Sequence, residues 1–169
     1  MIAATLRTAA LPALTRCATA ASATPRAAAA FVARRSFASS SYQLARRYSK
    51  DHEWADLPEG GSVATVGITK HAANQLGDVV FVELKQKGTQ VEEGAELGTI
   101  ESVKAVSELY APLSGTIEDI NKVVVDEPGT INEDPESDGW IVKVKVSSPV
   151  QFENLLTREA YDAFIAEDS

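Results

Sequence analysis

The chain has 169 residues, and its charge is divided unevenly along its length. Residues 1–50 carry a net charge of +8 without a single Asp or Glu, whereas residues 51–169 carry −16. The strongly acidic part argues against nucleic acid or anionic lipid as a partner and favours basic protein surfaces. The sequence contains no apolar run that approaches the roughly 20 residues needed to span a membrane, so we expect no membrane insertion.

The first 44 residues have the composition of a mitochondrial transit peptide. They are rich in Arg, Ala, Ser and Thr, and arginines interrupt the apolar core that a secretory signal needs. Arg35-Ser-Phe37 resembles a matrix processing site, so we expect residues 1–44 to be removed, at a boundary between 37 and 45, in the mitochondrial matrix. A basic tail that binds nucleic acid is the alternative. Because the only cysteine, Cys17, lies in this part, any thiol of the mature chain must come from an attached group.

Residues 45–169 predict one domain built mainly of short strands. Alternating or β-forming runs predict strands at 62–67, 79–84, 97–100, 107–110, 116–120 and 140–146, and a further strand at 122–125. Thr69 is expected to cap a short helix at 70–76 that Gly77 ends. Short strands separated by turns about every ten residues indicate a small sandwich or barrel of two antiparallel sheets.

Two helices are predicted at the C-terminal end, over residues 149–167. Ser148, Pro149 and Gln151 have the order of a capping box at the start of the first helix. Thr157 is expected to cap the second, whose apolar face begins with Tyr161. These helices follow the last strand and are expected to be appended to the sheets.

The segment Glu101–Glu108 reads nearly the same in both directions. Folding it about the Lys104–Ala105 bond places Glu101 opposite Glu108 in the register of a two-residue antiparallel hairpin. Lys104 then stands at the tip, on a turn that lacks the preferred Asn-Gly type of residues. Opposed like charges and a missing turn glycine weaken a hairpin, and broken local rules are typical of functional sites. On spacing alone, Lys104 as an ordinary solvated lysine stays open.

The longer segment Gly98–Gly115 closely resembles the lipoylation segment of the glycine cleavage system H-protein family. The family's other motifs follow in order at His52-Glu-Trp54, Leu76–Phe81, Pro128-Gly129 and Asp138-Gly-Trp140. The resemblance covers residues 48 to about 165, nearly the whole predicted mature chain.

This resemblance implies a lipoyl-domain-like fold, a flattened barrel-sandwich hybrid of two antiparallel sheets, with one lipoate joined covalently to Lys104. It implies a monomeric carrier without catalytic residues of its own. Its lipoyl group would accept the aminomethyl group that glycine decarboxylase (P protein) leaves after decarboxylation. The tetrahydrofolate-dependent aminomethyltransferase (T protein) would take over that group, and dihydrolipoamide dehydrogenase (L protein) would reoxidise the dithiol. Lipoyl-attaching enzymes are the remaining implied partners.

The resemblance also implies a cleft that shelters the loaded arm, with Glu53 and Glu108 as its lining carboxylates. Carboxylates there would hold a protonated amine through charge-assisted hydrogen bonds. The alternative is that both are solvated surface acids. No metal site is expected, because His52 and His71 are 19 residues apart and no cysteine is near them.

Two other functions stay open from the sequence. One is a lipoyl domain that serves a 2-oxo acid dehydrogenase, and the other is a regulatory homologue that is never modified. A biotinyl domain is disfavoured because Val103 and Ala105 stand where such domains have methionine.

Overall fold

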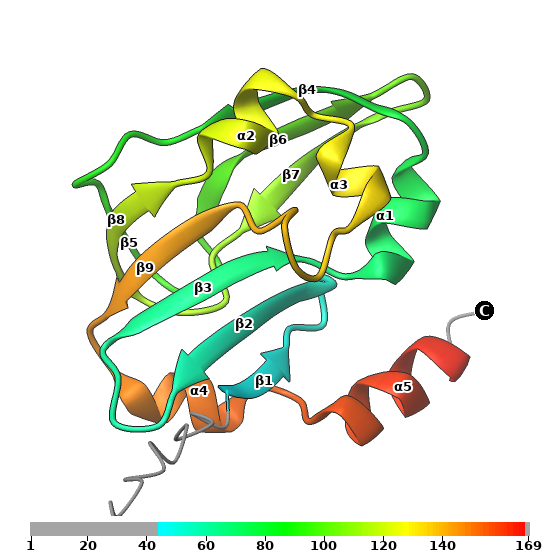
Figure 1. The fold of residues 1–169 in the computed structure, drawn as a ribbon. Helices are drawn as coiled ribbons and strands as arrows, with labels where there is room; N and C mark the ends of the chain where they lie inside the picture. The colour runs from blue at the N-terminus through cyan, green and yellow to red at the C-terminus, as the bar shows by residue number, and fades with distance from the viewer. Residues whose placement is uncertain (1–43, 168–169) are drawn as a thin grey trace, which may run out of the picture. The chain divides into compact units, whose positions relative to one another are not determined.

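The computed structural model describes residues 44–167, with side chains from residue 46, as two antiparallel sheets (Figure 1). The order in the first sheet is β1 (Leu44–Tyr48), β2 (Glu53–Pro58), β3 (Val63–Ile68), β9 (Val142–Val146), β8 (Gly115–Ile120) and β5 (Gln90–Val91). The order in the second is β4 (Val79–Leu84), β6 (Glu96–Ser102) and β7 (Val106–Tyr110). In the described range neither sheet closes on itself. The predicted mainly β fold of two antiparallel sheets is confirmed, with open sheets in place of a closed barrel.

The inner faces of the two sheets share one apolar core. Val66, Ile100, Leu109, Ile117 and Val144 come from five different strands, and each is at most 2% exposed. Alternation along the strands places these side chains inward, and their burial removes apolar surface from water at about 25 cal/mol per Å². The core therefore holds β6 and β7, which carry the predicted site, against the larger sheet.

The short helix α1 (Lys70–Leu76) forms as predicted. Thr69 is extended and its hydroxyl accepts a hydrogen bond from the backbone N–H of Ala72, at 3.3 Å. Gly77 ends the helix with a positive φ of 77°, which suits glycine. Local chemistry at both ends thus fixes where this helix begins and ends.

The predicted strand at 122–125 is wrong, because this segment forms the helix α2 (Lys122–Asp126). Valines favour strands only weakly, and packing overrides that preference. The Asn121 side chain accepts from the N–H of Val123 at 3.1 Å, and its amide donates to the carbonyl groups of Asp138 and Trp140. This N-cap, fixed by a remote loop, starts a helix that buries Val124. A further short helix, α3 (Thr130–Glu133), follows.

The two C-terminal helices are confirmed as α4 (Pro149–Asn154) and α5 (Arg158–Glu167). The capping box at Ser148 is wrong, because that side chain makes no capping hydrogen bond. Gln151 instead accepts from the N–H of Ser114 at 2.9 Å and donates to its hydroxyl at 3.0 Å. The Gln151 side chain, which the predicted capping box would need, is therefore hydrogen-bonded to the turn before β8. Thr157 caps α5 as predicted, by accepting from Ala160 N at 3.3 Å.

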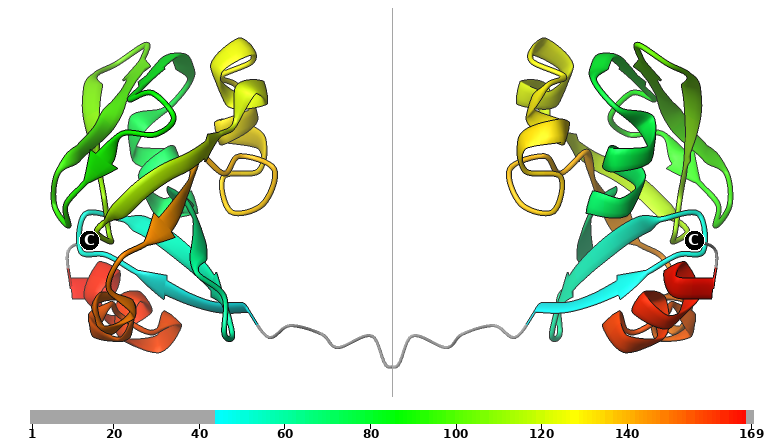
Figure 2. Two further views of the ribbon diagram at one scale, coloured as in Figure 1. Left: turned by 90° about the vertical axis from the view of Figure 1, so that its left-hand side faces the viewer. Right: turned by 90° about the vertical axis from the view of Figure 1, so that its right-hand side faces the viewer.

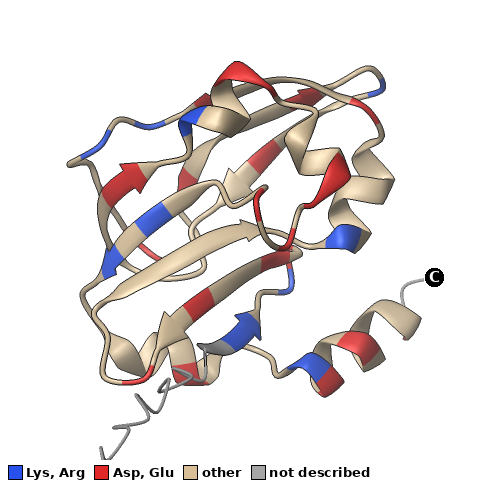
Figure 3. Ribbon diagram, in the orientation of Figure 1, with Lys and Arg blue, Asp and Glu red and all other residues tan. Residues whose placement is uncertain are grey.

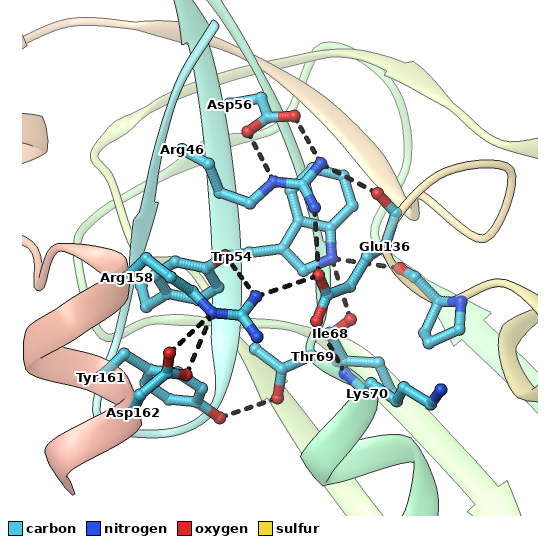
Figure 4. Close-up of polar contacts among 12 residues, drawn as sticks. Arg46, Trp54, Asp56, Ile68, Thr69, Lys70, Glu136, Arg158, Tyr161 and Asp162 are labelled. Atoms are coloured by element: carbon cyan, nitrogen blue, oxygen red, sulfur yellow. Dashed lines mark hydrogen bonds and ion pairs between the residues drawn. The ribbon is translucent and has the colours of Figure 1, made fainter. Parts of the chain in front are cut away.

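Helix α5 lies beside β1 (Figure 2). An ion-pair network fastens both to the rest of the fold (Figure 4). Arg46 donates to both carboxylate oxygens of Asp56, at 2.8 and 2.7 Å, and lies 4.2 Å from the centre of the Trp54 ring. The Oε2 atom of Glu136 lies 3.3 Å from Nη1 of Arg46 and 3.6 Å from Nη1 of Arg158 in α5. Bidentate, stacked arginines of this kind are held in one geometry. The last helix is therefore fixed against the sheet beside the His52-Glu-Trp54 segment.

Acidic residues are spread over both sheets and several helices (Figure 3). In the described range no helix is long and apolar enough to cross a membrane.

Candidate functional site

Lys104 stands at the tip of the β6–β7 hairpin, with an exposed side chain. The backbone N–H of Ser102 donates to the carbonyl of Ala105 at 2.8 Å and closes the turn. The two central residues are therefore Val103 and Lys104. The hairpin is confirmed, but its tip is centred one residue earlier than predicted.

The predicted pairing of the two glutamates is wrong. Glu101 lies opposite Val106, and Glu108 lies opposite Thr99. Moving the tip by one residue changes every partner by two, so side chains keep their face but meet new neighbours. The two carboxylates are therefore not opposed, and the like-charge penalty expected from the sequence is avoided.

Ser102 explains both the shift and the absence of a turn glycine. Its hydroxyl accepts from the N–H groups of Lys104 and Ala105, at 3.2 and 3.0 Å, and donates to the Ala105 carbonyl at 3.0 Å. A serine hydroxyl can replace backbone pairing in this way. No residue of the tip has a positive φ. The N–H of Val103 also donates to the carbonyl of Asp78, at 3.0 Å, which ties the tip to the loop after α1.

The Lys104 side chain passes close to Gly77. A Cβ atom at Gly77 would lie 3.4 Å from both Cε and Nζ of Lys104. In residues 46–167 the Lys104 amine has no hydrogen-bond or ion-pair partner. The amine is therefore available for covalent attachment without breaking a contact of the fold.

A cavity of about 300 Å³ adjoins the hairpin tip. This is the lower end of the roughly 300–1,000 Å³ typical of small-molecule sites. Its walls come from the turn before β2, from β3, from α1 and from the hairpin, and they comprise Asp51, His52, Glu53, Ile68, Ala72, Gln75, Leu76, Ile100 and residues 105–109. The structure thus brings Glu53 and Glu108 to one cavity beside Lys104. A larger hollow of about 930 Å³ contains none of the predicted site residues.

Glu53 is a buried carboxylate, only 2% exposed, so the solvated-acid alternative fails for it. It accepts hydrogen bonds from the Ser49 hydroxyl and from the backbone N–H of Tyr110, the latter at 3.1 Å. Burial raises the pKa of Glu53, and these two hydrogen bonds lower it in part. The carboxylate has neutral donors only, so it would gain most from a cation brought into the cavity.

Glu108 differs from Glu53 because it is exposed. The hydroxyl of Tyr110 donates to its carboxylate, which raises the pKa of Tyr110. This contact fixes the direction of the side chain along the cavity wall. Glu108 is therefore an oriented surface acid, weaker in electrostatic effect than Glu53 because water screens it.

The sequence reasoning did not predict Ser49, His52 or Tyr110 as site residues. Ser49 has a local signal, since a serine four residues before a buried acid can reach it within one turn. Tyr110 contributes a backbone N–H from a strand 57 residues away, and no local pattern announces that contact. Among the described residues no group of three His, Cys, Asp or Glu side chains is placed to hold a metal ion.

Comparison with known proteins now gives the family. The model described as glycine cleavage H-protein matches residues 46–168. The glycine cleavage system H protein of Phenylobacterium zucineum is 49% identical over 120 residues, which cover 71% of this chain and 98% of the relative. That of Thermotoga maritima is 46% identical over 123 residues, or 73% and 98%.

A crystal structure of a glycine cleavage system H protein from Mycobacterium marinum is similar in fold, with a TM-score of 0.63. It is 39% identical in sequence and covers 70% of this chain and 94% of that one. The two-sheet architecture, the ordered motifs and these matches lead to one assignment. The chain belongs to the glycine cleavage H-protein family, and it is a non-catalytic carrier component.

Proposed function

We propose that Lys104 carries a lipoyl group and that the chain works as the lipoyl carrier of the glycine cleavage system. The observation that carries this proposal is the position of the Lys104 amine. It is exposed and unpaired within the described range, at the tip of a hairpin, beside a cavity lined by Glu53 and Glu108. An attachment point needs access, and a labile cargo needs shelter; these residues provide both.

The residues fit the group. Amide formation removes the charge of the lysine, and no ion pair within residues 46–167 is lost with it. When bound, the lipoyl group supplies the dithiol on which the aminomethyl group of glycine is carried, and the mature sequence has no thiol of its own. The arm would start at the rim of the cavity, where the Lys104 chain already passes Gly77.

Glu53 is the residue that would hold the protonated amine of the cargo. A carboxylate buried in the cavity wall attracts an ammonium group more strongly than an exposed one, because the local dielectric is lower. A cation there would also offset the cost of burying the charge of Glu53. Glu108, oriented by Tyr110, would add a second and more screened contact.

The carrier would visit three enzymes: glycine decarboxylase, the tetrahydrofolate-dependent aminomethyltransferase and dihydrolipoamide dehydrogenase. A lipoyl-attaching enzyme would act before them. A tethered substrate reaches each active site at a high effective concentration. The net charge of −16 over residues 51–169 favours basic docking surfaces on these partners.

We infer that the carrier works in the mitochondrial matrix. Residues 1–43 lie outside the described residues, so the transit peptide 1–44 stays a prediction from composition. The start of the family match at residue 46 supports it, because that residue follows the predicted processing boundary of 37–45.

Intact mass spectrometry of the mature protein tests the attachment. We expect one lipoyl mass on the wild type, none on Lys104→Arg, and normal modification of the surface control Lys122→Arg. The lipoylated protein should support exchange of the glycine carboxyl group with CO2 by glycine decarboxylase, and Lys104→Arg should not. An unmodified Lys104 in cells with a working lipoylation pathway would contradict the proposal. Modification without exchange would favour 2-oxo acid dehydrogenase chemistry.

A further inference from the structure

His52 has an unusual backbone conformation next to the buried carboxylate. Its φ is 68°, and no other non-glycine residue in the described range has a positive φ. A left-handed conformation is unfavourable for an L-residue other than glycine, so the surroundings must hold it in place. His52 directly precedes Glu53, so its φ and ψ decide where the Glu53 carboxylate points. Both residues line the cavity.

The contacts that hold His52 come from the other end of the chain and from the cap of α1. Its Nδ1 lies 2.8 Å from the hydroxyl of Tyr161 in α5, within hydrogen-bond distance. Its carbonyl accepts from the N–H of Thr69 at 2.9 Å. The ring lies 6.0 Å from Phe164 and 4.8 Å from His71, measured between centroids.

Tyr161 is itself rigidly placed. It is 3% exposed and its ring stacks on Tyr48 at 4.7 Å. Its hydroxyl also lies 2.8 Å from Oγ1 of Thr69, the residue that caps α1 (Figure 4). One hydroxyl therefore joins both walls of the cavity: the turn that carries His52 and Glu53, and the start of the helix that supplies Ala72, Gln75 and Leu76.

We propose that Tyr161 is a positioning residue for Glu53. By bonding to His52 it holds the left-handed turn that fixes the direction of the neighbouring carboxylate. Helix α5 thus stabilises the cavity wall without lining it. This inference rests on the proposed role of Glu53 in holding the amine of the cargo. Tyr161 does not line the cavity; it reaches Glu53 through its bond to His52, while its second contact, to Thr69, holds the cap of α1.

The direct test is an NMR titration of the Glu53 side-chain carboxyl in the unmodified protein, residues 45–169. Tyr161→Phe keeps the ring and its stacking on Tyr48 but removes the hydroxyl. The freed turn lets Glu53 reach water, so its pKa falls toward the ~4.3 of a solvated glutamate. The matched control is Tyr48→Phe, which removes a hydroxyl from the same stack without touching His52 and leaves the Glu53 titration unchanged.

A second variant separates positioning from packing. Glycine adopts positive φ without strain, so in a His52→Gly background Glu53 keeps its direction without help, and adding Tyr161→Phe changes nothing further. In the lipoylated, aminomethyl-loaded carrier, Tyr161→Phe alone speeds loss of the cargo about fivefold, the factor expected for one hydrogen bond. An unchanged Glu53 titration in Tyr161→Phe overturns the inference, as does an equal shift in both backgrounds. Because the titration uses unmodified protein, it gives its answer even if Lys104 proves never to be lipoylated.

Discussion

Replacing Ser102 by alanine should loosen the hairpin tip without unfolding the protein. The Ser102 hydroxyl makes three hydrogen bonds within the turn, two to backbone N–H groups and one to a carbonyl. The site is half-exposed, so we assign the lower value of about 0.5 kcal/mol to each, or roughly 1.5 kcal/mol together. These bonds are lost from the folded state, so the free energy of local opening of the tip and the free energy of global unfolding both fall by this amount. About 1.4 kcal/mol corresponds to a factor of ten.

The measurement is hydrogen exchange at the backbone amide of Ala105, which donates to that hydroxyl. We expect exchange about tenfold faster in Ser102→Ala, and a free energy of global unfolding that is lower by the same roughly 1.5 kcal/mol. Ser107 is the matched control, because it occupies the mirror position of the near-palindrome and its side chain makes no hydrogen bond within the described residues. Equal acceleration in Ser107→Ala, or none in Ser102→Ala, would refute the assignment of the turn to the Ser102 hydroxyl.

Three further substitutions test the surroundings of the site. Glu53→Gln should change how stability depends on pH. Burial raises the pKa of Glu53 in the folded state, so between the unfolded-state and folded-state pKa values the folded wild type binds more protons than the unfolded chain. The free energy of unfolding of the wild type, relative to that of the variant, therefore falls as pH rises through this window and is level above it. Chemical denaturation at several pH values measures this. Gly67→Ala should destabilise by about 2–3 kcal/mol, since a Cβ there would lie 2.6 Å from the buried ring of Trp54; urea unfolding shows the cost. Arg46→Lys should cost about 1–2 kcal/mol in the same assay, because lysine can neither bond Asp56 bidentately nor stack on the indole.

Matched variants sharpen these expectations. Gly129→Ala should cost little, because a Cβ there meets nothing within 4 Å and its φ is −57°. Arg47→Lys should be nearly neutral, since Arg47 makes no ion pair within residues 46–167. A wild type whose stability relative to Glu53→Gln rises with pH would contradict the raised pKa. Equal losses at Gly67 and Gly129 would mean that the Trp54 contact is not what limits position 67.

Elements with their boundary chemistry in the local sequence were predictable. Thr69 and Gly77 mark both ends of α1, and the run at 79–84 forms β4 without a change of boundary. The strands β1 and β2 were not predicted. The hydrogen bonds of the Arg46 side chain go to partners in β2 and in the loop near Glu136. The contacts that hold β1 in place therefore come from outside it, and its own sequence does not indicate a strand. The segment of α2 was misread for the same reason, because its cap is held by carbonyls some 17 to 19 residues further on.

The site divides in the same way. The tip position of Lys104 follows from the near-symmetry of its own segment and from the family motifs. The register depends on one hydroxyl, that of Ser102, and a pattern of repeated residue types does not show which serine bonds to the turn. The surroundings of Glu53 include Tyr110 of β7, a strand that belongs to the other sheet. The sequence therefore identifies Glu53 as a site residue but does not predict that it is buried.

The exposed Lys104 and the buried Glu53 lie on different elements, and on the proposed function electrostatics explains why. A lysine that enzymes must reach has to be exposed, and an exposed carboxylate beside it would hold an ammonium ion weakly, because water screens the pair. A strong hold needs a buried carboxylate, which costs stability unless a cation is present. The fold accepts that cost at Glu53, where hydrogen bonds from Ser49 and the N–H of Tyr110 offset part of it. It accepts a second cost in the left-handed turn at His52, which contacts from α5 and the α1 cap hold in place. On the proposed function, the buried carboxylate would hold the cargo beside the strained turn until a partner enzyme draws the arm away from the cavity wall.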